Sequence, residues 1–166
     1  THIVFHPGFY GKKSKEETFS IIAEEIKEIM KIIKEKKWDV KLAPETTGKV
    51  NVFGDLNEIM NLVKETKCSF TIDFAHILAR SKGKIDYDDV FDKLKNFDHL
   101  HCHFSGSEWG EKGEKNHKLT PDKEIKELVS EVLKRKKSVT IINESPNPMK
   151  DTLRTKEEFV KQGYKW

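Results

Sequence analysis

Two spacings of hydrophobic residues alternate along the chain. Short apolar stretches predict five β-strands, over residues 2–8, 38–48, 68–78, 99–106 and 138–148. After each of them, apolar residues recur three or four positions apart, which is the period of an amphipathic helix. These segments predict five helices, over residues 15–33, 56–66, 87–97, 122–136 and a short stretch after 155. The pattern is therefore a regular βα alternation.

Capping motifs predict where several of the helices begin. Ser14 with Glu17 and Asp55 with Glu58 have the spacing of capping boxes, and Thr155 with Glu158 repeats it before the last helix. Thr120 and Pro121 predict the start of the fourth helix, with the proline in its first turn. Residues 105–118 are polar and rich in glycine, and we expect a long loop there.

Alternation of this kind predicts a parallel sheet, because parallel neighbours need a crossover connection and that connection is usually a helix. The alternatives are a doubly wound open sheet and part of a (β/α)8 barrel. The turn after the first strand, HPGFYGKKS, has neither a dinucleotide-binding nor a P-loop fingerprint. The residues at the strand ends favour the barrel.

Composition limits the function classes. The chain has 166 residues, 36% of them hydrophobic, which is enough for one domain spanning 1–166. Its formal net charge of +3 argues against a wholly polybasic chain. Two cysteines without a CxxC spacing make a disulfide framework or a thiolate zinc site improbable. No apolar run approaches the roughly 20 residues of a membrane span, and we expect a cytoplasmic protein.

Metal-type ligands stand at the end of every predicted strand. In parallel α/β folds, catalytic groups lie at the carboxyl ends of strands and in the loops that follow. These positions hold His6, Glu45, Asp73 with His76, His101 with His103, and Glu144. Imidazole and carboxylate without thiolate suit zinc, manganese or iron, and this many donors exceed the needs of one four-coordinate ion. We therefore predict a multinuclear centre of the kind that clamps both oxygens of a phosphate displacement.

The fourth strand carries three histidines on one face. His99, His101 and His103 alternate with Leu100 and Cys102, which point toward the helix layer. His103 lies nearest the carboxyl end, so we predict it as the ligand. His101 is one layer deeper, as a supporting or alternative ligand, and His99 is expected to be structural.

Six motifs in order give the sequence a specific resemblance. HPG (6–8), PETTG (44–48), IDFAH (72–76), HFSG (103–106), GEKNH (113–117) and NESP (143–146) resemble those of the endonuclease IV family of apurinic/apyrimidinic endonucleases, in particular its archaeal members. The resemblance covers essentially the whole chain. It implies a (β/α)8 barrel with up to three zinc ions that cleaves duplex DNA 5′ to an abasic site. It also implies a full-length protein that is a monomer and is associated with the nucleoid.

The resemblance also implies a role for each ligand. His6 and Glu45 would bind the first zinc, and Glu45 would bridge to the second. Asp73, His103 and Glu144 would complete the second site, and His76 and His117 would hold the third. Glu45 and Glu144 would flank the attacking hydroxide as catalytic groups, and manganese is an alternative metal.

Two departures from the family pattern matter. The family supplies an Asp-x-His pair to the third zinc, whereas the nearest match here is Glu114 and His117, three positions apart. In addition, the first three βα units of the barrel have no counterpart, so the chain corresponds to units four to eight. We expect a fragment of a longer protein, since five strands cannot close an eight-stranded barrel.

The loop at 105–118 offers candidate DNA contacts. Trp109 could stack on a base, and Lys49, Lys112 and Lys115 could meet phosphates. Two other function classes remain open. A sugar isomerase or epimerase of the same barrel superfamily would use Glu45, Asp73, His103 and Glu144 with one divalent ion, and an inactive fragment would only bind metal or DNA.

Overall fold

Strands and helices follow one another in the order that the hydrophobic pattern predicts. The computed structural model describes residues 1–165. Its elements are β1 (His2–Phe5), β2 (Gly8–Phe9), α1 (Lys15–Lys36), β3 (Lys41–Pro44), β4 (Val52–Phe53), α2 (Leu56–Thr66), β5 (Ile72–Asp73), α3 (Phe74–Arg80), α4 (Tyr87–Lys93), β6 (His99–Phe104), β7 (Gly106–Gly110), β8 (Gly113–Lys118), α5 (Asp122–Lys134), β9 (Ser138–Asn143) and α6 (Pro148–Lys161).

Five of the strands are parallel neighbours. β1 pairs with β3, and β5, β6 and β9 form a second parallel group with β6 in the middle. A parallel bridge between Glu45 and Thr71 joins the two groups, supported by Thr71 N donating to Pro44 O over 3.1 Å. The spatial order β1-β3-β5-β6-β9 follows the chain order. This confirms the α/β fold class and is the arrangement of consecutive strands in a (β/α)8 barrel.

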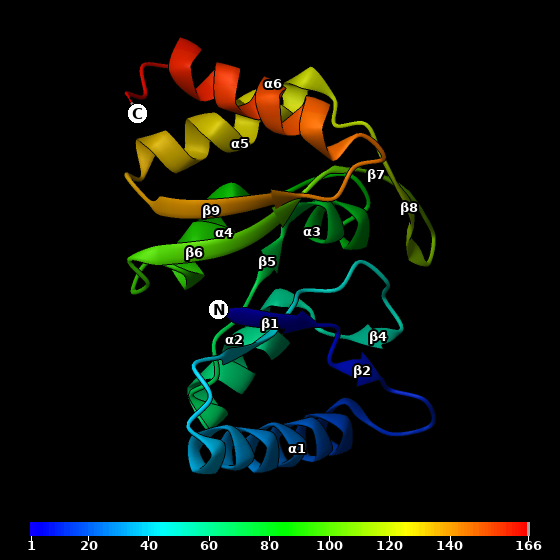
Figure 1. Ribbon diagram of the computed structural model, residues 1–166. Helices are drawn as coiled ribbons and strands as arrows, with labels where there is room; N and C mark the ends of the chain where they lie inside the picture. Colours follow the sequence, from blue (N-terminus) through cyan, green and yellow to red (C-terminus); the bar gives the residue numbers. More distant parts are fainter. Residues whose placement is uncertain (166) are drawn as a thin grey trace.

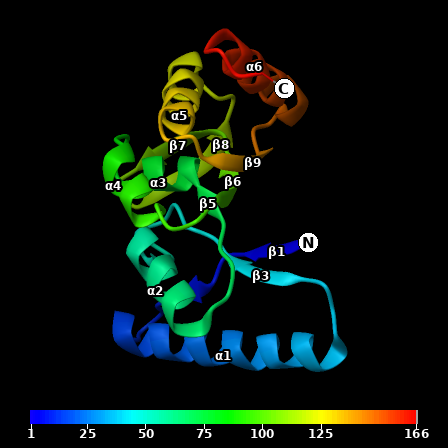
Figure 2. The same ribbon diagram turned by 90° about the vertical axis from the view of Figure 1, so that its left-hand side faces the viewer.

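The helices surround the strands from outside (Figures 1 and 2). In Figure 2, α1 lies along the bottom, α2 and α4 at the side and α5 with α6 at the top, while β1, β3, β6 and β9 lie within this arc. Among the described residues, no helix lies on the inner side of the arc, between β9 and β1. Because the five strands are parallel neighbours, their carboxyl ends lie along one edge.

The apolar faces of the helices bury two clusters against the strands. The larger cluster is centred on α3, α4, α5 and the sheet of β5 and β6, and contains Ile59, Phe70, Ile72, Phe74, Val90, Phe91, Leu94, Leu100, Cys102, Phe104, Ile125, Leu128, Val129, Val132 and Phe159. The smaller one lies between α1, α2 and β3, and contains Ile22, Ala23, Ile26, Leu42, Phe53, Leu62 and Cys68. Burial of these side chains fixes the helix layer on the sheet.

The first two predicted helix starts are confirmed. Ser14 and Glu17 form a complete capping box on α1, and Asp55 and Glu58 form one on α2. Each box satisfies backbone N–H groups that the first turn leaves without partners.

The predicted start of α6 is wrong, whereas α5 begins at Asp122 as predicted but without the predicted cap. Thr155 lies inside α6, which begins at Pro148 with Asn147 as its N-cap; an asparagine before a proline is itself a start signal. Thr120 does not cap α5, because its backbone N–H and its hydroxyl both donate to Asp151 of α6. The N-cap of α5 is Pro121, without a side-chain hydrogen bond.

The third βα unit also differs from the prediction. The predicted strand over 68–78 is limited to β5, because Asp73 caps a helix there by accepting from the backbone of Ala75 and His76. This helix, α3, precedes α4, so the unit has two helices instead of one. The strong apolar run of 68–78 fits a strand and a buried helix equally, which is why periodicity did not separate them.

The predicted loop at 105–118 is a β-hairpin. β7 and β8 pair from Gly106 with Lys118 to Gly110 with Gly113, with an irregularity between Glu108 and Trp109. Its tip docks against the loop after β3, where Lys49 and Gly113 form an antiparallel bridge. The hairpin therefore lies beside the strand ends at a fixed position.

Among the helices of residues 1–165, none combines the length and the apolar character needed to cross a bilayer.

Candidate metal centre

The predicted ligands gather at the carboxyl ends of the parallel strands. His6 follows β1, Glu45 follows β3, Asp73 ends β5 and Glu144 follows β9. On β6, His103 pairs in register with Asp73, so the two side chains stand at the same level. Parallel pairing thus brings together residues that are up to 138 positions apart, since strand ends share one edge of the sheet.

Three groups of donor atoms form within this edge. In each group, the ligand atoms lie within 4.8 Å of one another. The first group is His6, Glu45 and His76; the second is Glu45, Asp73, His103 and Glu144; the third is Asp73, His76 and His117. All seven residues predicted as ligands occur in them. Glu45, Asp73 and His76 belong to two groups each, so the groups adjoin as bridged metal sites do.

Several buried atoms of this centre lack a hydrogen-bond partner. They are Glu45 Oε1, Asp73 Oδ2 and His103 Nδ1. Glu45 Oε1 lies only 2.8 Å from His103 Nδ1, yet the two are not aligned for a hydrogen bond. Unpaired buried polar atoms are costly, and close donors that face a shared point are what a cation requires. The residues present therefore fit a divalent metal ion.

Two histidines are oriented by hydrogen bonds on their far ring nitrogen. His76 Nδ1 donates to the Thr46 carbonyl over 2.8 Å, and His117 Nδ1 is hydrogen-bonded to Ser105 Oγ. Both rings consequently direct Nε2 into the centre. Such outer partners fix the tautomer and orientation of metal-binding imidazoles. Thr46 and Ser105 lie within the motifs PETTG and HFSG, but the sequence analysis assigned no role to either.

Glu114 lies between these two imidazoles. Its Oε2 is 3.3 Å from His76 Nε2 and its Oε1 is 3.2 Å from His117 Nε2. The sequence left its role open, because its spacing to His117 departs from the family pattern. The hairpin places it at the third donor group nonetheless, with both carboxylate oxygens facing imidazole nitrogens. Glu114 therefore has the position of a further ligand.

The other histidines of the strands lie outside the donor groups. His101 stacks on His2 with ring centroids 4.8 Å apart, and His99 bonds Ser138 and Thr140 through its two ring nitrogens. The structure thus favours His103 over His101 as the residue at the centre. His99 has the structural contacts that the sequence predicts.

The carboxylates and imidazoles of the centre shift one another's pKa values. Burial alone would raise the pKa of Glu45, but the imidazoles of His103 and His6 beside it lower that pKa to about 2. Burial alone would lower the pKa of His103, but the carboxylates of Glu144 and Glu45 raise it to about 10. Without metal, His103 is thus a cation held between two carboxylates. A metal ion would replace its proton as the positive charge.

At Asp73 and His76, which are more deeply buried, burial and charged neighbours likewise shift the pKa values in opposite directions. Asp73 is fully buried, which raises its pKa to about 6 although His76 beside it lowers it. Glu114 and Asp73 raise the pKa of His76 to about 9 against the effect of burial. Groups whose pKa values are shifted by burial and by specific charged neighbours make this edge of the sheet a candidate functional site.

Comparison with known proteins identifies the family. The sequence matches the family described as "Xylose isomerase-like TIM barrel" over residues 1–166. The chain belongs to the xylose isomerase-like TIM-barrel family. This family is shared by endonuclease IV and by sugar isomerases and epimerases, so membership shows the fold and leaves the substrate open.

One curated protein and one solved structure are similar to the chain. It is 39% identical over 159 residues to the uncharacterized protein MJ0133 of Methanocaldococcus jannaschii, covering 87% of this chain and 58% of that protein. The apo crystal structure of 3-keto-D-glucoside 4-epimerase, YcjR, from E. coli has a TM-score of 0.54 at 12% identity, covering 90% of this chain and 56% of that one. The chain thus spans little more than half the length of either relative.

The candidate DNA-binding residues lie next to the centre. Lys49, Lys112 and Lys115 line a cavity of about 450 Å³ between the hairpin tip and the loop after β3. Glu114 lines the same cavity, which therefore adjoins the third donor group. Trp109 is 40% exposed, and part of its indole lies against Gly83.

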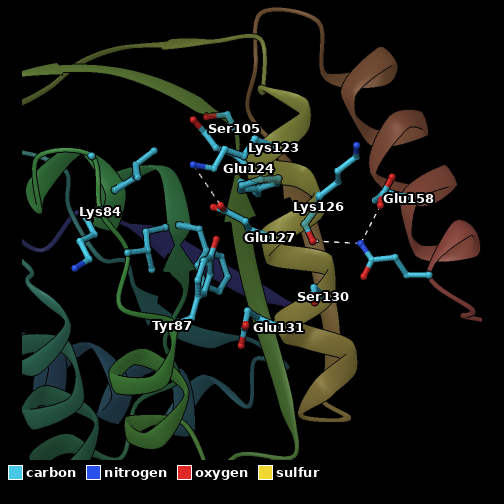
Figure 3. A pocket seen from close by; sticks show the side chains of 16 residues that line it. Lys84, Tyr87, Ser105, Lys123, Glu124, Lys126, Glu127, Ser130, Glu131 and Glu158 are labelled. Atoms are coloured by element: carbon cyan, nitrogen blue, oxygen red, sulfur yellow. Dashed lines mark hydrogen bonds and ion pairs between the residues drawn. The ribbon is translucent and has the colours of Figure 1, made fainter.

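A larger cavity, of about 640 Å³, lies outside the strand ends, between the α3–α4 region and α5 (Figure 3). Figure 3 shows Tyr87 on one side and Glu124, Glu127 and Glu131 of α5 on the other. Of the ligands predicted from the sequence, none lines it. The cavity lies within the helix layer and borders the metal centre at Ser105, which is hydrogen-bonded to His117.

Proposed function

We propose that the full-length gene product containing this chain is a zinc-dependent phosphodiesterase that cleaves duplex DNA on the 5′ side of abasic sites. The observation that carries the proposal is the set of three adjoining donor groups. One divalent ion uses four to six donors, whereas eight side chains converge here when Glu114 is included. Several ions at one site are typical of phosphoryl-transfer enzymes.

The residues divide among the ions as follows in this proposal. His6 and Glu45 would hold the first ion, and Glu45 would also contribute to the second site. Asp73, His103 and Glu144 would complete the second site. His76, His117 and Glu114 would hold the third ion. The unpaired atoms Glu45 Oε1, Asp73 Oδ2 and His103 Nδ1 all fall in the second site, which supports this division.

The protein side chains have distinct tasks in the reaction. When bound, divalent ions supply Lewis acidity and neutralise charge on the reacting phosphate. Glu144 stands at the opening, with 35% of its side chain exposed, so a water molecule can reach its carboxylate. Glu144 would accept the proton of the attacking water at its free oxygen. Glu45, nearly fully buried, orients the centre through contacts with His103 and His6.

Substrate recognition rests on charge beside the centre. Lys49, Lys112 and Lys115 surround the cavity at the hairpin tip and can contact phosphates on either side of the cleaved bond. An abasic nucleotide has no base to unstack, so it reaches a recessed centre at lower cost than an intact one. These features together favour DNA with a missing base.

A sugar isomerase or epimerase is the second candidate, because the group of Glu45, Asp73, His103 and Glu144 forms a one-metal site by itself. Such an enzyme has no need for the imidazoles of His6, His76 and His117. The third donor group therefore distinguishes the two functions.

The test uses the full-length gene product with an end-labelled duplex that contains one abasic site. We expect a single nick 5′ to the site, abolished by EDTA and restored by zinc, and no nick in the matched intact duplex. The Glu144→Gln variant should bind the abasic duplex without cleaving it. Absence of nicking together with interconversion of ketose and aldose sugars would refute the proposal in favour of the second candidate.

A further inference from the structure

The third donor group is assembled from three separate elements. Asp73 ends β5 and His76 lies in the first turn of α3, whereas His117 and the neighbouring Glu114 lie on β8 of the hairpin. Glu114 lies between the two imidazoles, with its oxygens 3.3 Å from His76 and 3.2 Å from His117. The geometry of the group therefore depends on how the hairpin sits on α3.

One anchor of the hairpin is a contact between Trp109 and Gly83. Gly83 follows α3, and a Cβ added to it would lie 2.3 Å from Trp109 Cζ2, with two further indole atoms at 3.0 and 3.1 Å. The indole thus occupies the space where any other residue has its side chain. Next to it, Lys82 Nζ lies 3.3 Å from Glu111 Oε2 at the hairpin tip.

This anchor is linked to the donor group through the pairing of β7 with β8. Trp109 of β7 is the cross-strand partner of Glu114 of β8. Cross-strand partners share a face and move together, so the position of the indole sets the position of the Glu114 carboxylate. The opposite side of the tip is held by the backbone, where Glu114 N donates to Gly48 O over 3.0 Å and Val50 N donates to Lys112 O over 3.2 Å.

We propose that the Trp109–Gly83 contact is a positioning device that holds the β7–β8 hairpin on the end of α3, so that Glu114 and His117 face His76. The part of this inference that concerns the third zinc ion rests on the proposed function. Trp109 and Gly83 do not touch the donor atoms themselves. They act through Glu114, and their loss is expected to empty the third site while leaving the other two occupied.

The decisive variants are Gly83→Ala and Trp109→Ala in the full-length gene product. Gly83→Ala places a methyl group in the space that the Trp109 indole occupies. Trp109→Ala removes the indole without changing the sequence of the loop after α3. Gly163→Ala is the matched control, because Gly163 also follows a helix with a similar positive φ, +95° against +91°, yet nothing lies within 4 Å of the added Cβ. Trp109→Phe retains a ring and should preserve the contact.

Zinc content after dialysis is the first readout. We expect about three zinc ions per chain in the wild type, Gly163→Ala and Trp109→Phe, and about two in Gly83→Ala and Trp109→Ala. Equal zinc content in all variants would overturn the inference. So would an equal loss of all ions in Gly83→Ala and Gly163→Ala, since that would show general destabilisation by backbone strain.

Amide hydrogen exchange on the metal-free protein is the second readout, and it separates this inference from the proposed function. In Gly83→Ala and Trp109→Ala, the amides of Glu114 and Val50 should exchange about tenfold faster or more, while those of α5 keep their wild-type rates. If the wild type binds a single ion, the proposed function fails, and this exchange result still decides whether the contact positions the hairpin. Unchanged exchange would overturn the positioning role.

Discussion

Replacing Asp73 by asparagine should stabilise the metal-free protein. The side chain is fully buried, and its Oδ2 has no hydrogen-bond partner. Its pKa is raised from 3.8 to about 6. At about 1.4 kcal/mol per unit, ionisation of Asp73 costs the folded state about 3 kcal/mol at pH 8. Asparagine avoids this cost and retains the Oδ1 acceptor that caps α3.

The sign of the pH dependence follows from the direction of the shift. Between pH 3.8 and about 6, folded Asp73 binds more protons than unfolded Asp73, so the free energy of unfolding falls as the pH rises. The advantage of Asp73→Asn should therefore grow as the pH rises from about 4 and level off at about 3 kcal/mol near pH 8. Below both pKa values it should vanish.

Urea unfolding of the EDTA-treated full-length gene product measures this difference. The exposed Asp98→Asn serves as the control and should change the free energy of unfolding by less than about 0.5 kcal/mol. Added zinc should make the wild type more stable than Asp73→Asn, because the ion binds the folded wild type and the asparagine amide is a poorer ligand than the carboxylate. A metal-free Asp73→Asn variant that is less stable than the wild type at pH 8 would refute the reasoning.

Three further predictions follow from the same contacts. Zinc binding should release protons and weaken as the pH falls, because the pKa of His103 is raised to about 10 and its proton must leave; calorimetry in buffers of different ionisation enthalpy would show it, and buffer-independent heats would contradict it. Asp151→Ala should lower the free energy of unfolding by about 2–4 kcal/mol in urea titrations, because Thr120 loses its buried acceptor. The stability of Asp151→Asn should lie between those of the wild type and Asp151→Ala. Lys49→Ala and Lys112→Ala should each reduce the slope of log K against log salt for duplex DNA by about 1, and an unchanged slope would remove that lysine from the DNA-binding surface.

The sequence by itself determined the fold class and the ligand types. The βα alternation requires parallel strands, and parallel strands bring their carboxyl ends to one edge, so His6, Glu45, Asp73, His103 and Glu144 could be grouped before any coordinates. Helix starts marked by local capping boxes, at Ser14 and Asp55, were likewise readable, because the hydrogen bonds involved span only three residues.

Only the tertiary structure decided the features that depend on distant partners. Thr120 has the sequence of a cap, but Asp151, 31 residues away, binds it instead. The polar stretch at 105–118 shows no strand pattern, since its hairpin is held by backbone bonds to Gly48 and by the indole on Gly83, and neither contact requires alternation of apolar residues. Glu114 reaches the donor group only because that hairpin docks there, a long-range contact that spacing along the chain does not encode.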